Sequence, residues 1–157
     1  MMIGRSGCRC QIPNYLIARF CNRFPNIDMS YEVQDDENFS AGVNITLPVT
    51  LKRDLEGNIE VGPVNASMYP KAKEESWWLV VGDTKSTNQL LAIKRVFLQR
   101  KSSVKLEFAA PAQPGKKTYT LYLMCDPYLG CDQEYSFCVH VKDSTDPYKD
   151  GMREYSK

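Results

Sequence analysis

The chain has no long apolar run, only one histidine and almost no net charge. Its longest uninterrupted apolar run, from Trp77 to Val81, is far shorter than the roughly 20 residues that a membrane-spanning helix needs. A net charge of +1 gives no general attraction to nucleic acid or to anionic membranes, so any RNA contact must be local. A length of 157 residues is ordinary for one domain with its own core.

Cysteine is missing from the middle of the chain. A secreted immunoglobulin domain usually joins an early strand to a late one by a disulfide, and the early strand candidates here have no cysteine. We therefore expect reduced thiols, and residues 1–10 do not have the pattern of a secretory signal, so we expect the cytoplasm or nucleus. Sequons at Asn38, Asn44 and Asn65 favour a secreted surface instead, but such short motifs recur by chance. An extracellular adhesion or receptor domain is the alternative.

The apolar pattern predicts one short helix and then strands. Residues 14–22 fit a helix that ends before Pro25, and from Ile27 onward apolar residues recur every second position, as on half-buried strands. Pro48 lacks an N–H group, which indicates an edge strand or a bulge at that point. The predicted strands are 27–33, 43–51, 77–83, 89–98, 104–110, 119–125 and 135–141, with 62–69 as a short eighth strand at best.

Seven or eight short strands without long helices predict an all-β fold. The strand spacing and turn residues favour an immunoglobulin/fibronectin III-like antiparallel β-sandwich with a short N-terminal helical segment. We expect residues 1–24 to be an extension with that helix, 25–142 to be the sandwich, and 143–157 to be a flexible polar tail, because the tail lacks apolar periodicity.

Two blocks of unusual composition carry a family resemblance. One runs from Glu74 to Lys85, the other from Gly130 to Phe137, and Leu91 to Arg95 lies between them. These blocks, at this separation, closely resemble the C-terminal β-domain of the Sec-homology region in the large spliceosomal RNA helicase of the tri-snRNP, in its plant-like form. The likeness extends from about Ala18 to Lys142.

The resemblance implies a noncatalytic scaffold domain in the nucleus that supports pre-mRNA splicing. It implies docking on spliceosomal proteins and on the helical part of the same helicase cassette, with no cofactor, membrane or small-molecule substrate. Equivalent tail domains of the activating-signal cointegrator helicase, a meiotic helicase and a translocon protein are the near alternatives. Since residues 1–14 depart from the family, we expect a fragment, a truncated product or a paralogue without the motor.

The segment from Gly82 to Ser86 superficially resembles the end of a phosphate-binding loop. Such a loop requires Gly directly before the Lys and again five residues earlier, but Thr84 and Leu79 stand there. A strand-ending turn is the expected structure. Without this loop the chain is not expected to hydrolyse ATP or to be an enzyme.

Cysteine and histidine offer further chemistry, but in weak patterns. Catalysis by a cysteine and histidine pair would have to use His140 with Cys138, and no orienting third group is recognisable. Neither candidate zinc set has the paired CxxC spacing of zinc sites, so we expect packing thiols and no metal. The two sets are Cys8, Cys10 and Cys21, and Cys125, Cys131, Cys138 and His140.

Adjacent tryptophans are the strongest sign of an interaction surface. Neighbouring side chains of a strand point to opposite faces, so one indole must leave the core. Exposed aromatic residues are enriched at interface hot spots, although a loop from Met68 to Lys73 that merely covers the indole is an equal alternative. The candidate interaction residues are Trp77, Trp78, Tyr122, Tyr128 and Tyr135.

Basic residues gather between positions 94 and 117, where a one-sided cluster would bind RNA phosphates. Asp83, Glu107 and Asp126 interrupt the cluster, and no aromatic stacking pattern accompanies it. A solvated surface is the preferred interpretation, with RNA contact as a minor hypothesis. The candidate contacts are Lys94, Arg95, Arg100, Lys101 and Lys105.

Overall fold

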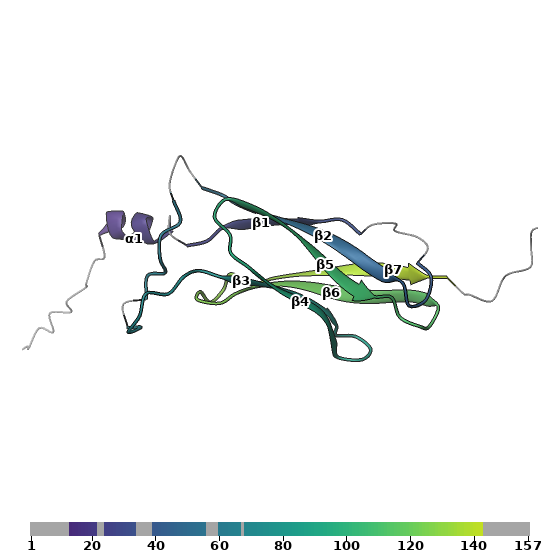
Figure 1. Ribbon diagram of the computed structural model, residues 1–157. Helices are drawn as coiled ribbons and strands as arrows, with labels where there is room; N and C mark the ends of the chain where they lie inside the picture. The colour runs from purple at the N-terminus through teal and green to yellow at the C-terminus, as the bar shows by residue number, and fades with distance from the viewer. Residues whose placement is uncertain (1–12, 22–23, 34–38, 56–59, 67, 143–157) are drawn as a thin grey trace, which may run out of the picture.

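Seven strands form two antiparallel sheets that pack face to face (Figure 1). The computed structural model describes residues 13–21, 24–33, 39–55, 60–66 and 68–142. The elements are α1 (Asn14–Cys21), β1 (Ile27–Tyr31), β2 (Asn44–Arg53), β3 (Trp77–Asp83), β4 (Gln89–Val96), β5 (Lys101–Ala109), β6 (Gly115–Cys125) and β7 (Gln133–Val141).

The strand order is that of an immunoglobulin/fibronectin III-like sandwich. One sheet has the order β1-β2-β5 and the other β4-β3-β6-β7, and the chain crosses between them after β2, β4 and β5. Each strand pairing is antiparallel. The predicted all-β fold class, with its short helical segment before the sandwich, is confirmed, and the described residues contain seven of the seven or eight predicted strands.

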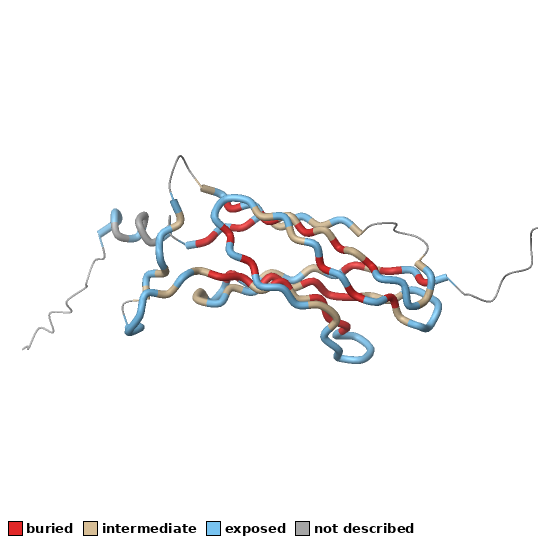
Figure 2. The backbone as a smooth tube through the Cα atoms, in the orientation of Figure 1, coloured by how far each residue is buried: buried red, intermediate tan, exposed pale blue. Residues whose placement is uncertain are grey.

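The core lies between the sheets, where every second residue of each strand points inward. Figure 2 shows the buried residues along the facing sides of the two sheets. In β2 the inward positions Leu47, Val49 and Leu51 are completely buried, and in β3 Trp77 and Leu79 are as well. Burial of each such side chain contributes about 1.5–3 kcal/mol, so the two-residue alternation is the main source of the fold's stability.

The predicted eighth strand is not formed. Its described residues, 62–66 and 68–69, have no strand structure and belong to the long connection between β2 and β3. The connection is instead held by hydrogen bonds within itself, from Val64 N to Lys73 O at 2.9 Å and from Tyr69 N to Ala66 O at 3.0 Å. Pro63 and Pro70 cannot donate to a ladder, which explains why this apolar segment does not join a sheet.

The position of Pro48 corrects the expectation of an edge strand or bulge. β2 is the central strand of its sheet, and Pro48 pairs with Lys105 of β5. On the other side, β1 ends at Tyr31, and Glu32 N donates to Pro48 O over 3.2 Å. Because the N and O atoms of a strand residue point to the same side, the missing N–H of Pro48 faces the place where β1 has just ended.

Candidate protein-interaction surface

The outer face of the three-stranded sheet is polar. Hydroxyl and charged side chains follow one another there, and the Thr50 and Ser103 hydroxyl oxygens lie 3.2 Å apart across β2 and β5. An antiparallel sheet with such a face is suited to water and needs no cover. The outward residues are Asp28 and Ser30 of β1, Thr46, Pro48, Thr50 and Lys52 of β2, and Lys101, Ser103, Lys105 and Glu107 of β5.

The outer face of the four-stranded sheet is apolar at its centre. Strand register places Val80 of β3 between Ile93 of β4 and Tyr122 of β6. Ile93 remains 54% exposed and Met124 37% exposed, whereas the others are half-buried. We define the apolar face by these outward side chains: Trp78, Val80, Ile93, Tyr122 and Met124.

Arg95 fixes one end of the apolar face. Its guanidinium carbon lies 5.4 Å from the centroid of the Trp78 ring and 5.2 Å from that of Phe97. The same guanidinium donates to Ser76 Oγ at 3.0 Å and lies 3.9 Å from a carboxylate oxygen of Asp126. Cation–π stacking on two rings orients the arginine more firmly than its half-exposed ion pair, because exposed pairs contribute little. The indole is therefore held in place at the surface.

Trp77, on the opposite side of β3, belongs to the core. Its Nε1 donates to Glu75 Oε1 at 2.7 Å, and the same oxygen forms an ion pair with Arg53. The side chains of Arg53 and Glu75 are 4% and 6% exposed. Burial lowers the pKa of Arg53. This buried cluster makes Trp77 part of the support beneath the apolar face, and Trp77 contributes no exposed area to it.

The connection between β2 and β3 contacts Asp126, which also pairs with Arg95. Within the described residues, the ion pair of Lys73 is with Asp126 at 3.6 Å, and its ammonium lies 5.7 Å from the centroid of the Tyr69 ring. The Trp78 ring contacts the Arg95 guanidinium. These contacts favour the interpretation in which Trp78 is presented at the surface.

The three candidate tyrosines separate in space. Tyr122 lies on the apolar face, opposite Val80. Tyr128 follows β6, with its ring centroid 6.0 Å from that of Phe24. Tyr135 occupies an inward position of β7, 6.0 Å from the ring of Tyr31. Of the candidate set, only Trp78 and Tyr122 therefore share the apolar face.

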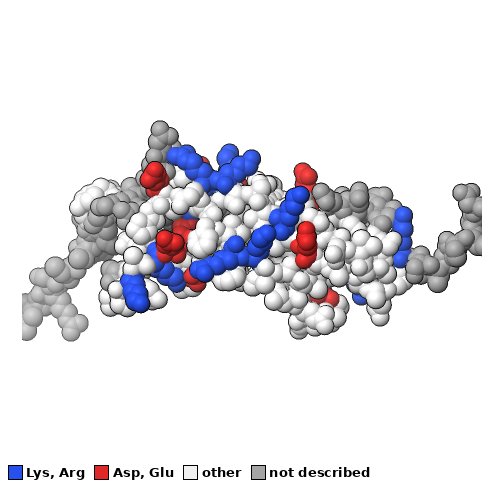
Figure 3. All heavy atoms as spheres, viewed as in Figure 1, with Lys and Arg blue, Asp and Glu red and all other residues white. Residues whose placement is uncertain are grey.

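The basic candidates also divide between surfaces. Lys94 and Arg95 are neighbours on β4, so they point to opposite sides of its sheet. Lys101 and Lys105 lie on the polar outer face of the other sheet, and Arg100 precedes β5. Figure 3 shows basic side chains in an oblique row across one face of the molecule, with acidic side chains beside them. The structure therefore does not bring the five residues together on one face of one sheet.

The segment that resembled a phosphate-binding loop is the turn between β3 and β4, as predicted. Asp83 accepts hydrogen bonds from the Ser86 hydroxyl, from Ser86 N at 2.9 Å and from the Thr87 hydroxyl at 2.9 Å. These bonds, the Ser86 hydroxyl foremost, lower the pKa of Asp83 to about 2. The aspartate thus closes the turn with its own carboxylate.

The late cysteines lie at two ends of one strand pair. Cys125 is the last residue of β6, whereas Cys138 pairs with Thr118 near the start of β6. At a rise of about 3.3 Å per residue, Thr118 and Cys125 are about 23 Å apart along the strand. Burial raises the pKa of Cys125 to about 11 and also raises the pKa of Cys131. His140 lies beyond Cys138 on the same outer face. The four residues of this predicted zinc set therefore do not converge.

Four described cysteines are free thiols: Cys21, Cys125, Cys131 and Cys138. Cys8 and Cys10, which would complete the other zinc set, lie outside the described residues. In the described ranges no group of three or more His, Cys, Asp or Glu side chains is placed to hold a metal ion. No helix in those ranges has the length and apolar character to cross a membrane.

Sequence reasoning missed most of the apolar face. Val80 lies two residues after Trp78 on β3, so the alternation of the strand could have predicted that its side chain points outward. The positions of Ile93 and Met124 could not be predicted, because β4 is apolar on both sides and because only the strand register places these two residues beside β3. Cross-strand neighbours are decided by pairing and not by distance along the chain.

Together these features define an immunoglobulin/fibronectin III-like β-sandwich with one polar and one apolar outer face. Residues 9–138 match the model of the Sec63 Brl domain. The chain belongs to this Sec63 Brl domain family, and the resemblance predicted from its sequence is confirmed.

The chain is 69% identical over 128 residues to "DExH-box ATP-dependent RNA helicase DExH12" of Arabidopsis thaliana. It is 52% identical over 128 residues to "U5 small nuclear ribonucleoprotein 200 kDa helicase" of Homo sapiens. Each alignment covers 82% of this chain but only 6% of the relative. Among solved structures, a CARDB domain from Pyrococcus furiosus shares 13% identity at a TM-score of 0.45, with 76% of this chain and 90% of that domain covered.

Proposed function

We propose that this chain is a noncatalytic scaffold and protein-interaction domain from a spliceosomal RNA helicase cassette, and that it supports pre-mRNA splicing in the nucleus. The observation that carries the proposal is the contrast between the two outer faces of the sandwich. One face is polar and suited to contact with water, whereas the other presents Trp78, Ile93 and Met124 around Val80. The relatives named as helicases, one of them as a U5 small nuclear ribonucleoprotein, support the context.

The partner we propose for the apolar face is the helical part of the same helicase cassette, with spliceosomal proteins as further partners. A helix that carries an apolar stripe covers a sheet face in two-layer proteins. Arg95, at the end of the face, favours an acidic residue on that helix, because its exposed ion pair with Asp126 is long. Trp78 is the expected hot spot, since it is large, rigid and already oriented.

No catalytic step is part of this proposal. In such a cassette, ATP-driven unwinding belongs to other domains, and the segment shared with this chain is only 6% of each relative. Contact of Lys94, Lys101 or Lys105 with RNA is proposed only as a minor contribution, because these side chains lie on the edge and on the polar face rather than around an aromatic platform.

The docking proposal is tested by binding in trans. The chain is mixed with DExH12 from which the matching 128-residue segment has been deleted, and affinity is measured by calorimetry. We expect Trp78→Ala and Ile93→Lys each to weaken binding at least about tenfold, because Trp78 is the expected hot spot and Ile93 lies beside Val80 at the centre of the apolar face. Circular dichroism of each variant before mixing confirms that the fold is retained.

The matched control is Thr50→Lys, which places the same new charge on the polar face of the other sheet. We expect this variant to bind like the unchanged chain. If Thr50→Lys weakens binding as much as Ile93→Lys does, or if the unchanged chain does not bind at all, the proposed docking face is wrong.

A further inference from the structure

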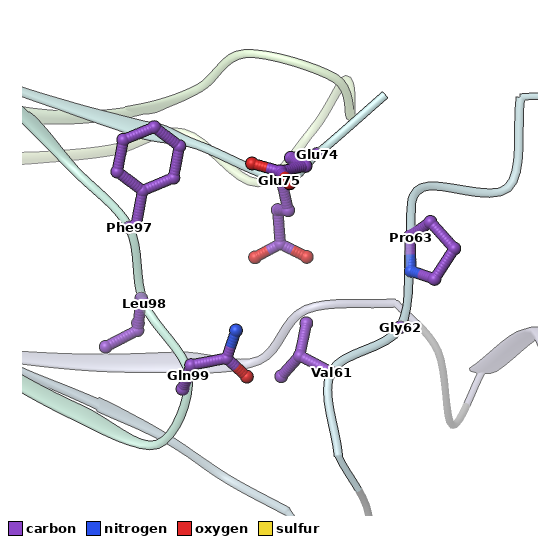
Figure 4. Close-up of a pocket in the computed structure, with 8 residues that line it drawn as sticks. All are labelled: Val61, Gly62, Pro63, Glu74, Glu75, Phe97, Leu98 and Gln99. Atoms are coloured by element: carbon purple, nitrogen blue, oxygen red, sulfur yellow. The ribbon is translucent and has the colours of Figure 1, made fainter. Parts of the chain in front are cut away.

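A cavity of about 400 Å³ lies outside the apolar face, where the connection between β2 and β3 passes the turn between β4 and β5. Val61 and Pro63 form one wall, and Phe97 and Gln99 form the other (Figure 4). Glu74 and Glu75 line it from the approach to β3. The proposed function makes no use of this cavity.

Glu75 presents an unused acceptor to the cavity. Its side chain is 94% buried, yet Figure 4 shows its carboxylate pointing into the open space between Phe97 and Pro63. Arg53 and the Trp77 indole both contact Oε1, and Oε2 accepts no hydrogen bond from any residue that the structure describes. Oε2 is not among the buried polar atoms that lack a partner, and the carboxylate faces the cavity. A donor that enters the cavity therefore gains a charge-assisted hydrogen bond with it.

The charge balance of the cavity favours a cation. Arg53 neutralises one of the two glutamates, and Glu74 adds a second carboxylate at the exposed rim. An anion would meet two carboxylates, and a purely apolar group would leave Oε2 without a donor. The ring of Phe97 is 57% exposed and already lies 5.2 Å from the Arg95 guanidinium carbon, so a second planar cation stacks on its other face. A guanidinium meets both conditions, because it is planar, always charged and rich in N–H donors.

We propose that this cavity binds the guanidinium of an arginine side chain presented by a partner polypeptide. The guanidinium donates to Glu75 Oε2, stacks on the Phe97 ring and is attracted by Glu74. The volume suits one long side chain and excludes a whole helix. The cavity is thus a specificity pocket beside the apolar face, and the contact of Phe97 with Arg95 connects the two.

The test is an NMR titration of the ¹⁵N-labelled chain with N-acetyl-L-argininamide. We expect saturable shifts at the amides of Gly62, Phe97 and Gln99 and at the Trp77 indole, whose acceptor carboxylate the guanidinium shares. The neutral isostere N-acetyl-citrullinamide is expected to leave these signals in place. Comparison with the spectrum of Trp78→Phe assigns the two indole signals.

Two variants of exposed residues make the test specific. Phe97→Ala and Glu74→Gln are each expected to weaken the arginine response at least about threefold, since each removes one of the attractions. Glu107→Gln, an exposed carboxylate on the polar face, is the matched control and is expected to change nothing. Equal shifts with the citrulline probe, or a response that Phe97→Ala and Glu74→Gln leave unchanged, would overturn the proposal without bearing on the docking of Trp78.

Discussion

At the scale of single residues, the cluster of Arg53, Glu75 and Trp77 links the core to both proposed sites. The ion pair is buried, and Arg53 Nε has no hydrogen-bond partner among the described residues. A buried pair gains little over a well-packed apolar pair, but loss of one partner leaves a buried charge without compensation. The cluster therefore fixes a geometry more than it adds stability, since it holds the indole and turns Glu75 Oε2 toward the cavity.

We expect Arg53→Met to lower the free energy of unfolding by about 3–5 kcal/mol, because it strands the Glu75 carboxylate in the interior. The double variant Arg53→Met, Glu75→Gln is expected to recover a large part of that loss, since the uncompensated charge is gone while an oxygen still accepts from Trp77. Urea unfolding of the single and double variants measures both values. Strictly additive losses would show that the two residues are not coupled.

Asp83 predicts a pH dependence of stability. Hydrogen bonds lower its pKa from 3.8 to about 2, so the folded chain binds this proton less tightly than the unfolded chain does. The stabilisation is present above the unfolded value and is lost as the pH falls toward the folded value. We expect Asp83→Asn to be less stable than the unchanged chain at neutral pH, with the difference shrinking between about pH 4 and pH 2. Urea unfolding across this range checks it, and a constant difference would contradict the assignment.

At the scale of elements, β3 shows how much the alternation determined. Adjacent tryptophans had to lie on opposite faces, and the structure places Trp77 inward and Trp78 outward. Which of them faced inward depended on the partner strands, because β3 is apolar on both sides. The prediction for Pro48 was wrong for a related reason. Its missing N–H correctly indicated a position without a pairing partner on one side, but that position lies next to the end of β1 and not at a sheet edge.

The two tryptophans are expected to differ sharply in stability. Trp77→Ala removes a completely buried indole and is expected to cost about 3–5 kcal/mol of unfolding free energy. Trp78→Ala removes a half-buried ring from the surface and is expected to cost less than about 1.5 kcal/mol, while it weakens docking. Thermal and urea unfolding of both variants provides the comparison. Equal losses would mean that Trp78 serves the core rather than an interface.

At the scale of the whole molecule, the proposed function depends on the contrast between the two outer faces. The near-neutral net charge of the chain gives no sign of this contrast, because charges of both signs lie on the polar face and Arg95 lies on the apolar face. The docking experiment in trans belongs to this scale because it asks whether one face as a unit is covered. The arginine titration belongs beside it, because it asks whether the end of the sandwich adds a second, charge-selective contact.

The sequence by itself determined the two-residue alternation, hence the strands and the sandwich, and its Glu74 to Lys85 and Gly130 to Phe137 blocks indicated the family. The alternation and the two blocks are local properties, because each can be recognised within a short segment of the chain. The tertiary structure alone decided the register that sets Ile93, Val80 and Tyr122 in one row, and the meeting of Glu75 with Phe97 across a cavity. Such neighbours come from backbone pairing between distant segments, which no spacing along the chain encodes.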